Sequence, residues 1–461
     1  MDIDIVSPGK SALLMARIPG IDHTRAVILG AHIDSPNTPG AFDNGSGSTA
    51  LIEVARALDR ARIVPPVDLH LVWFGSHERG VYGSAQFVAR HSELIDRSLA
   101  MLQMDCLGRP VDDISNFITL EAWPYGRFGD DGLPWPDFLE EAALDRGIPT
   151  EPVPYYGLVS DNSNFGAFDL PNANLIYMNP YNIVEIHYDN HLHDPYDTVE
   201  LASEVGDVFE DMAEVMLTAA LRTAEDAPRL RVTPEPDRRA LLVGSHTEAA
   251  HMSGASFTEF GMALAWEGID VDAIGYGQPL TAADLEDTDV VVALPVHDYP
   301  SDEGDVSLYD EAWTQAEIDA IEEWVQSGGL LVLTNSAHRL KYVNYVYEGN
   351  EDWSDVNALG ERFGVSFTAG GLGGSTATAS GNHPLVSGVS SLQLAEDNGV
   401  RYSATGAEVL ARVAAFPAVS LLTVGAGEVL VLSDVGMLGS RGGEPANLQF
   451  WRNLAEYARA H

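Results

Sequence analysis

Short apolar runs that alternate with segments of helical periodicity place the strongest constraint on the fold of this chain. In the first half, the strand-like runs are 26–32, 67–76, 99–105, 117–123 and 174–179. Between them, residues 49–61 and 133–147 carry apolar side chains at the spacing of one helix face. Alternation of this kind is typical of an α/β fold with a largely parallel sheet.

The same alternation continues after a proline-rich break. Residues 240–245, 289–296, 328–336 and 427–436 are strand-like, and 314–328 and 447–460 have helical periodicity. Three prolines and alternating charges at 224–239 favour a linker. Because 461 residues exceed one ordinary domain, we expect α/β domains at 1–225 and 240–461 and a linker at 226–239. Each domain should hold a mostly parallel sheet with helices on both faces.

The charge balance limits the partners that this chain can bind. Acidic residues number 69 and basic residues 25, which gives a net charge of −44, and only Lys10 and Lys341 are lysines. We interpret this as an acidic, halophilic surface that repels nucleic acid and anionic membranes. The N-terminus lacks a basic stretch followed by an apolar one, so it does not resemble a signal peptide, which favours the cytoplasm and leaves the location open.

Cysteine usage restricts the metal chemistry. Cys106 is the only cysteine, which excludes an intramolecular disulfide, a cysteine zinc cluster and an iron–sulfur cluster. Any metal must therefore be held by histidines and carboxylates. Candidates for this role follow predicted strands, at the sheet edge where open α/β folds bind ligands: His32, Asp34, Asp43, Glu78, Asp105 and His193.

The residue types of this set suit a divalent metal. Apart from Asp34, the set has two histidines and three carboxylates and no thiol. These ligands fit zinc, cobalt or manganese, and they suffice for two ions if one carboxylate bridges. Asp34 follows His32 in H-x-D spacing. We expect its side chain to accept the second ring N–H of His32 and to fix the ring tautomer.

Six short motifs carry a family resemblance: GAHIDS, GAFDNGSGS, FGSHERGVYGS, MDCLG, SDNSNF and HDPYDT. In order and spacing they resemble the M28 family of zinc aminopeptidases over residues 10–225. The resemblance implies a phosphorylase/hydrolase-like fold with a dinuclear site. In that site His32 and Asp105 bind one zinc ion, Glu78 and His193 bind the other, and Asp43 bridges them.

The resemblance also implies two finer features. One is a cis peptide bond between Asp43 and Asn44, which is rare outside X–Pro bonds. The other is a position for the SDNSNF segment near the substrate. Asp161 in that segment is therefore a candidate for binding the substrate amine or for supporting the metal ligands.

His77 departs from the family pattern. The family carries a Glu–Glu pair where this chain has His77 and Glu78, so Glu78 keeps the ligand position and His77 occupies that of the general base. A neutral imidazole accepts a proton near pH 7, but nearby cations oppose the charge that it gains. The expectation is a slower enzyme or an alkaline optimum, and the competing interpretation of His77 is a solvated loop residue. A second departure is the missing helical segment before the first strand.

Residues 240–461 resemble the class I glutamine-amidotransferase-like fold, a flavodoxin-like sandwich. Enzymes of that fold use a cysteine nucleophile, and this half of the chain has none. Amidotransferase chemistry is therefore excluded. We expect a binding, lid or oligomerisation role, and a homo-oligomer is an open alternative.

The leading functional hypothesis is a co-catalytic metallo-aminopeptidase that releases N-terminal residues from a peptide substrate. Two bridged ions would activate water and leave one face open for the free amine. One alternative keeps the scaffold but changes the substrate, as an M28-like carboxypeptidase or an amide-processing enzyme. The other is a metal-binding pseudo-peptidase that acts as a binding or scaffold protein.

Overall fold

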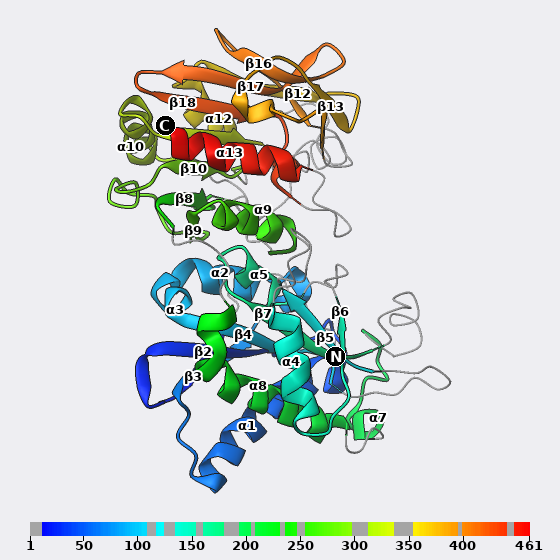
Figure 1. Cartoon of the computed structure of the whole chain (residues 1–461). Helices are drawn as coiled ribbons and strands as arrows, with labels where there is room; N and C mark the ends of the chain where they lie inside the picture. The colour runs from blue at the N-terminus through cyan, green and yellow to red at the C-terminus, as the bar shows by residue number, and fades with distance from the viewer. Residues whose placement is uncertain are drawn as a thin grey trace. The chain divides into compact units, whose positions relative to one another are not determined.

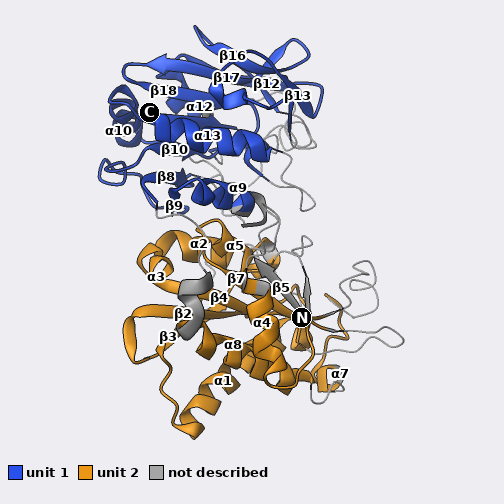
Figure 2. Ribbon diagram, in the orientation of Figure 1, with its two compact units in different colours: residues 1–8, 233–252, 256–461 blue, residues 9–232, 253–255 orange. Residues whose placement is uncertain are grey.

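The computed structural model divides into two compact units (Figure 2). Unit 2 contains residues 9–232 and 253–255, and unit 1 contains residues 1–8, 233–252 and 256–461. The structure describes residues 12–107, 117–123, 134–153, 160–178, 193–203, 208–230, 236–246, 254–296, 312–335, 354–394, 399–439 and 447–461.

The division between the units falls inside the predicted linker, but the linker is shorter than we expected. Residues 226–230 complete helix α8 (Val208–Leu230), and 238–239 begin strand β8 (Arg238–Val243). Pro228 thus lies within the last turn of a helix. The periodicity of this helix therefore extends further along the chain than the composition indicated.

Unit 2 is built on a seven-stranded sheet with the order β1-β3-β2-β4-β7-β5-β6. The strands are Leu14–Ile18, Asp22–His32, Val67–Phe74, Ser98–Met104, Phe117–Trp123, Glu151–Val153 and Asn172–Met178, numbered β1 to β7 in chain order. The pairs β1–β3 and β5–β7 are antiparallel and the other four are parallel. The expectation of a mostly parallel first sheet is confirmed.

Helices cover both faces of this sheet (Figure 1). Alternate strand residues, such as Leu29, Leu71 and Leu102, pack against one face with α1 (Gly47–Ala61), α4 (Pro134–Leu144) and α8. Their neighbours, such as Ile28 and Phe74, pack on the other face with α2 (Tyr82–Arg90), α3 (Ser92–Asp96) and α5 (Ser163–Gly166). Burial on both faces explains the continuous apolar runs of these strands.

Helix α8 is the longest helix among the described residues, with 23 residues. Its buried side is made by Met212, Val215, Met216 and Ala219, which join the core under α1 and α4. Its first turn carries Glu210 and Asp211, so the helix is amphipathic. None of the helices that the structure describes is long and apolar enough to cross a membrane.

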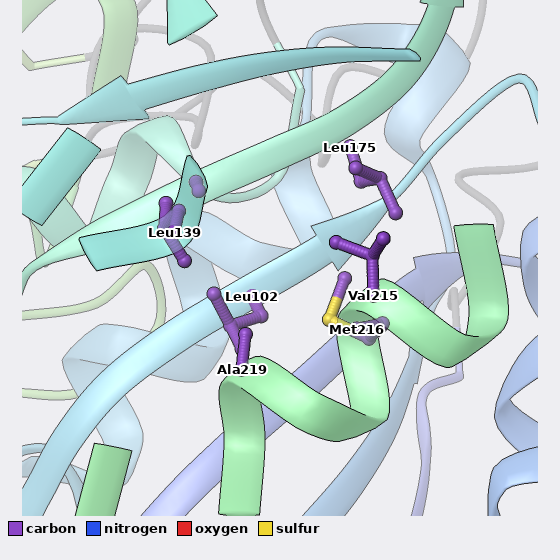
Figure 3. A pocket seen from close by; sticks show the side chains of 7 residues that line it. Leu102, Leu139, Leu175, Val215, Met216 and Ala219 are labelled. Carbon is purple, nitrogen blue, oxygen red and sulfur yellow. The ribbon is translucent and has the colours of Figure 1, made fainter. Parts of the chain in front are cut away.

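A small cavity lies under α4 and α8 (Figure 3). Its lining is entirely apolar and consists of Leu102, Leu139, Ala173, Leu175, Val215, Met216 and Ala219. A ligand site needs a few polar groups that fix orientation, and this lining offers none. The cavity is therefore a gap in the packing of the core.

Unit 1 contains a nine-stranded sheet with the order β14-β13-β16-β17-β18-β11-β10-β8-β9. The parallel half consists of β8, β9 (Ile269–Ile274), β10 (Val290–Ala293), β11 (Leu330–Thr334) and β18 (Gly427–Leu432). The antiparallel half consists of β13 (Thr376–Ala379), β14 (Ser391–Gln393), β16 (Glu408–Val413) and β17 (Phe416–Val424). The expectation of a mostly parallel second sheet is therefore wrong, because only half of the strand pairs are parallel.

Helices and a small sheet cover the parallel half. Helices α10 (Gln315–Gln326) and α12 (Ser354–Glu361) pack on one face together with a two-stranded sheet of β12 (Val365–Gly371) and β15 (Val400–Ala404). The opposite face carries α9 (Gly254–Trp266) and α13 (Leu448–Ala460) (Figure 1). Phe260 of α9 and Trp451 of α13 meet edge to face with their ring centroids 5.9 Å apart.

Glu317 fixes the start of α10 and yields a test of the unit 1 fold. Its buried carboxylate accepts hydrogen bonds from Leu280 N–H, from the N–H and hydroxyl of Thr314, and from His246. We expect Glu317→Ala to lower the free energy of unfolding by about 2–3 kcal/mol, because these donors lose their acceptor. Denaturant unfolding measures this free energy. The control variant Glu323→Ala, on the exposed side of the helix, should have nearly the same free energy of unfolding as wild type.

The pH dependence of this effect has a defined sign. Burial acts to raise the pKa of Glu317, but hydrogen bonds from His246 and Thr314 outweigh it and lower the pKa from 4.5 to about 2. The ionised carboxylate therefore stabilises the fold above pH 4.5 and loses this effect as the pH falls toward 2. The difference between wild type and variant should be smaller at about pH 3 than at pH 7. An equal difference at both values would contradict this assignment.

Candidate metal centre

The ends of two neighbouring parallel strands bring His32 and Asp105 together. His32 is the last residue of β2, and Asp105 directly follows β4. Both side chains are buried, and His32 Nε2 lies 3.1 Å from Asp105 Oδ1. The second oxygen of Asp105 accepts a hydrogen bond from Ser160 Oγ at 2.8 Å. Adjacency of β2 and β4 in the sheet thus creates the first half of the site.

The loop before α1 places Asp43 beside this pair. The peptide bond between Asp43 and Asn44 is cis, as the resemblance implied. The Asn44 amide donates to Met104 O at the end of β4 and accepts from Gly47 N–H. A Cβ atom at Gly47 would lie 2.3 Å from that same carbonyl oxygen, so glycine is required where the loop crosses the strand end.

Asp43 stands between two histidines. Its Oδ1 lies 3.1 Å from His32 Nε2, and its Oδ2 lies 3.1 Å from His193 Nε2. The same nitrogen of His193 is 3.1 Å from Glu78 Oε2. The structure therefore brings all five predicted ligand residues together in two half-sites that share the Asp43 carboxylate.

The spacing and chemistry of these atoms fit divalent cations. Ligands that bind one ion tetrahedrally at about 2.0–2.1 Å lie about 3.3–3.4 Å from one another, close to the distances between these donor atoms. Glu78 Oε1 is buried without a hydrogen-bond partner, which is costly unless a cation or water satisfies it. His32 with Asp105 and His193 with Glu78 could each hold one ion, with Asp43 as the shared ligand.

The electrostatics of the centre favour positive charge at both imidazoles. Hydrogen bonds to Asp43 and Glu78 raise the pKa of His193 to about 10, against the opposing effect of burial. Burial also acts to lower the pKa of His32, but the Asp105 carboxylate outweighs it and raises that pKa well above its ordinary value. Burial acts to raise the pKa of Asp43, but His193 and His32 hold it below its usual range. Carboxylates that hold protons on histidine in this way also attract cations.

Asp34 supports the centre differently from our expectation. His32 Nδ1 is hydrogen-bonded to the backbone oxygen of Asp34 at 3.0 Å, whereas the Asp34 carboxylate is 3.9 Å away. That carboxylate instead accepts the backbone N–H groups of His77 and Glu78 at 3.0 and 3.1 Å. The prediction that the Asp34 side chain fixes the His32 tautomer is therefore wrong, because its oxygens are occupied by the turn after β3.

This turn aims two side chains into the site. The short helix His77–Arg79 follows β3, and it is flanked by Ser76 (φ 57°) and Val81 (φ 54°) in the left-handed region. A β-branched residue in that region is strained, so the surrounding contacts must hold the turn. The two hydrogen bonds to Asp34 are contacts of this kind, and they fix the backbone from which Glu78 reaches His193.

His77 and Asp161 form a buried pair. His77 is 12% exposed, stacks on His32 and lies 3.1 Å from Asp161 through Nδ1, so it is not a solvated loop residue. Asp161 has no exposed surface. Its oxygens accept hydrogen bonds from His77, Ser84 and Gln103. Of the two roles predicted for Asp161, its burial favours the supporting role over binding of the substrate amine.

Two supporting residues escaped the sequence reasoning. Asp197 is buried and accepts the backbone N–H groups of Phe42 and Asp43 at 2.6 and 3.0 Å. Ser160 donates to Asp105. Both lie in or beside the motifs HDPYDT and SDNSNF that carried the resemblance. Their place in these motifs could have marked both residues as candidates, but it does not reveal which atoms they contact.

Comparison with known proteins agrees with this geometry. Residues 14–220 match the family model of peptidase family M28. The chain is 33% identical over 168 residues to the probable leucine aminopeptidase 2 of Arthroderma benhamiae. This match covers 35% of this chain and 32% of that protein. It is 30% identical over 155 residues to aminopeptidase YwaD of Bacillus subtilis, with 32% of each chain covered. Residues 14–220, somewhat less than half of the chain, are therefore similar to peptidase family M28.

The relatives named here share only part of their length with this chain. The chain spans about a third of the length of the curated relatives that it matches. Among solved structures, a zinc aminopeptidase from Bacillus subtilis, BSAP, is 24% identical, with a TM-score of 0.39, and the match covers 46% of this chain and 49% of that one.

The hydrogen bonds of Asp34 predict an effect on metal affinity. Asp34→Ala removes the acceptor that holds the backbone of His77 and Glu78, so the ligand oxygens of Glu78 lose their fixed position. We expect zinc affinity to fall about 10–100-fold. Competition titration against a zinc indicator measures this, with Asp59→Ala on the exposed side of α1 as the control. Equal affinity for Asp34→Ala and wild type would contradict the assigned role.

Proposed function

We propose that the M28 domain is a co-catalytic dinuclear metallo-aminopeptidase that hydrolyses N-terminal residues from peptides. The observation that carries the proposal is the Asp43 carboxylate, whose two oxygens each lie 3.1 Å from a histidine Nε2. Each histidine nitrogen is also 3.1 Å from a second carboxylate, from Asp105 or Glu78. The names of the matched relatives, which are aminopeptidases, support the same reaction class.

Two divalent cations, zinc on this nitrogen and oxygen donor set, would polarise the scissile carbonyl and acidify a water. His32 and Asp105 would hold one ion, Glu78 and His193 the other, and Asp43 both. His77 occupies the position at which members of the M28 family are expected to carry the glutamate base. It would take the proton from the attacking water. The side chain of Asp34 would keep the turn that bears His77 and Glu78 in place.

For unit 1 we propose a binding, lid or oligomerisation role. Its parallel strands have the order β9-β8-β10-β11-β18, which in chain order is the 2-1-3-4-5 order of flavodoxin-like sheets. This order supports the flavodoxin-like interpretation for that half of the sheet only. The only cysteine of the chain, Cys106, lies in unit 2, so unit 1 cannot supply the nucleophile of an amidotransferase. The acidic composition supports a working environment of high salt.

Hydrolysis assays test the proposed activity. Chelator-treated protein is resupplied with zinc, cobalt or manganese at molar salt and given a free aminoacyl anilide or its N-acetylated form. We expect wild type to cleave only the free-amine substrate, and Asp43→Ala to fall to background because both half-sites lose a ligand. Asp59→Ala is the matched control.

Three outcomes would count against this proposal. Cleavage that survives in Asp43→Ala after chelation would show that the metal centre is not the active site. Cleavage of the N-acetylated substrate alone would show that a free amine is not required, which would favour an amide-processing enzyme. Activity found only in His77→Glu would identify the natural chain as a metal-binding pseudo-peptidase.

A further inference from the structure

Asp161 is a buried carboxylate whose partners do not include a lysine or arginine among the described residues. It has no exposed surface and lies behind the metal centre, one residue after Ser160. It accepts hydrogen bonds from the hydroxyl of Ser84, from Gln103 Nε2 at 3.3 Å and from His77 Nδ1 at 3.1 Å. Burying a carboxylate is costly unless it is well hydrogen-bonded, so these three donors hold Asp161 in place.

The contact with Asp161 fixes the tautomer of His77. An ionised carboxylate only accepts hydrogen bonds, so His77 Nδ1 must be the donor. In the neutral ring, Nε2 then carries the lone pair. This nitrogen faces the metal centre, since it lies 4.0 Å from Asp105 Oδ2.

Distance alone would also allow His77 to be a metal ligand. The donor atoms of His32, His77 and Asp105 all lie within 4.8 Å of one another. A hydrogen bond from the other ring N–H to a carboxylate is common for metal-bound histidines as well. The orientation of the two rings decides between these roles.

The rings of His32 and His77 are stacked, with centroids 3.8 Å apart and planes inclined by 4°. An imidazole nitrogen binds a cation in the plane of its own ring, along its lone pair. Planes in van der Waals contact are about 3.5 Å apart, which exceeds a zinc–nitrogen bond of about 2.0–2.1 Å. The two lone pairs therefore do not converge on one ion, and His77 Nε2 is left free to accept a proton.

The geometry points to Asp161 as the positioning residue that holds His77 in the tautomer and orientation in which Nε2 accepts a proton. A glutamate at position 77 could accept the proton without such a partner. This inference rests on the proposed peptidase function. An O–H bond of water breaks and its proton moves to His77 Nε2, while the water oxygen bonds to the peptide carbonyl carbon. The same proton then passes to the amide nitrogen as the C–N bond breaks, which gives a free amino acid and the shortened peptide.

A double-mutant cycle between positions 77 and 161 tests this role. In Asp161→Asn the amide donates to Nδ1 and favours the opposite tautomer, so kcat should fall about 10²–10⁴-fold with little change in KM. In the His77→Glu background a carboxylate accepts the proton, so adding Asp161→Asn should cost little. Asp68→Asn, another buried aspartate, near the other end of the sheet, is the matched control for loss of stability.

Two measurements do not depend on activity. Cobalt-loaded His77→Gln and Asp161→Asn should keep the visible absorption spectrum and metal content of wild type, because His77 is not a ligand. In zinc-loaded protein with ¹⁵N-labelled histidine, the His77 signals, assigned by their loss in His77→Gln, should show a protonated Nδ1 and an unprotonated Nε2. The two should exchange roles in Asp161→Asn.

The results that would overturn the inference are distinct from those that would overturn the function. Equal losses of kcat for Asp161→Asn in both backgrounds would make Asp161 merely structural. A changed cobalt spectrum in His77→Gln would make His77 a ligand, and an Nε2–H tautomer in wild type would remove the proposed acceptor. If wild type cleaves no substrate, the proposed function fails, while the cobalt and ¹⁵N results still decide whether Asp161 positions His77.

Discussion

The Asp43 carboxylate between His32 and His193 is the contact on which the rest of the site depends. It joins residues from the end of β2 and from the segment after β7, so neither half-site is complete without it. Asp197 and Asn44 hold the loop that carries it. The parallel strands supply the edge at which all of these side chains meet. Without a metal ion, the carboxylates of Asp43, Asp105 and Glu78 would share only the two protons on Nε2 of His32 and His193. The arrangement of these groups therefore favours the binding of positive charge.

The sequence predicted the strand ends and the five clustered residues because both depend on coarse rules. Buried parallel strands are continuous apolar runs, and their ends share one edge. The partners of Asp34 and Asp161 could not be predicted in this way. Which oxygen meets which N–H depends on turns of a few residues, and the turn after β3 contains left-handed Ser76 and Val81 that no spacing rule indicates.

The antiparallel half of the second sheet was missed for a different reason. Strands such as β13 and β14 are three or four residues long and alternate exposed with buried side chains. The apolar residues of these short strands therefore never form a run, and threonines, serines and a glutamine occupy the exposed positions. This reason does not apply to β17, which was also missed although 418–422 are buried in succession. Four of the five parallel strands, β8, β10, β11 and β18, were predicted, and β10 and β11 are buried throughout. The fifth, β9, was missed, and its apolar run is broken by the exposed Asp270.

Anomalous diffraction from zinc-soaked crystals would locate the bound metal ions. We predict two zinc peaks, one between His32 and Asp105 and one between His193 and Glu78, with the Asp43 carboxylate between them. We also predict that His77 Nε2 is bonded to neither ion. A single peak, peaks away from Asp43, or a zinc–nitrogen bond to His77 would contradict this arrangement.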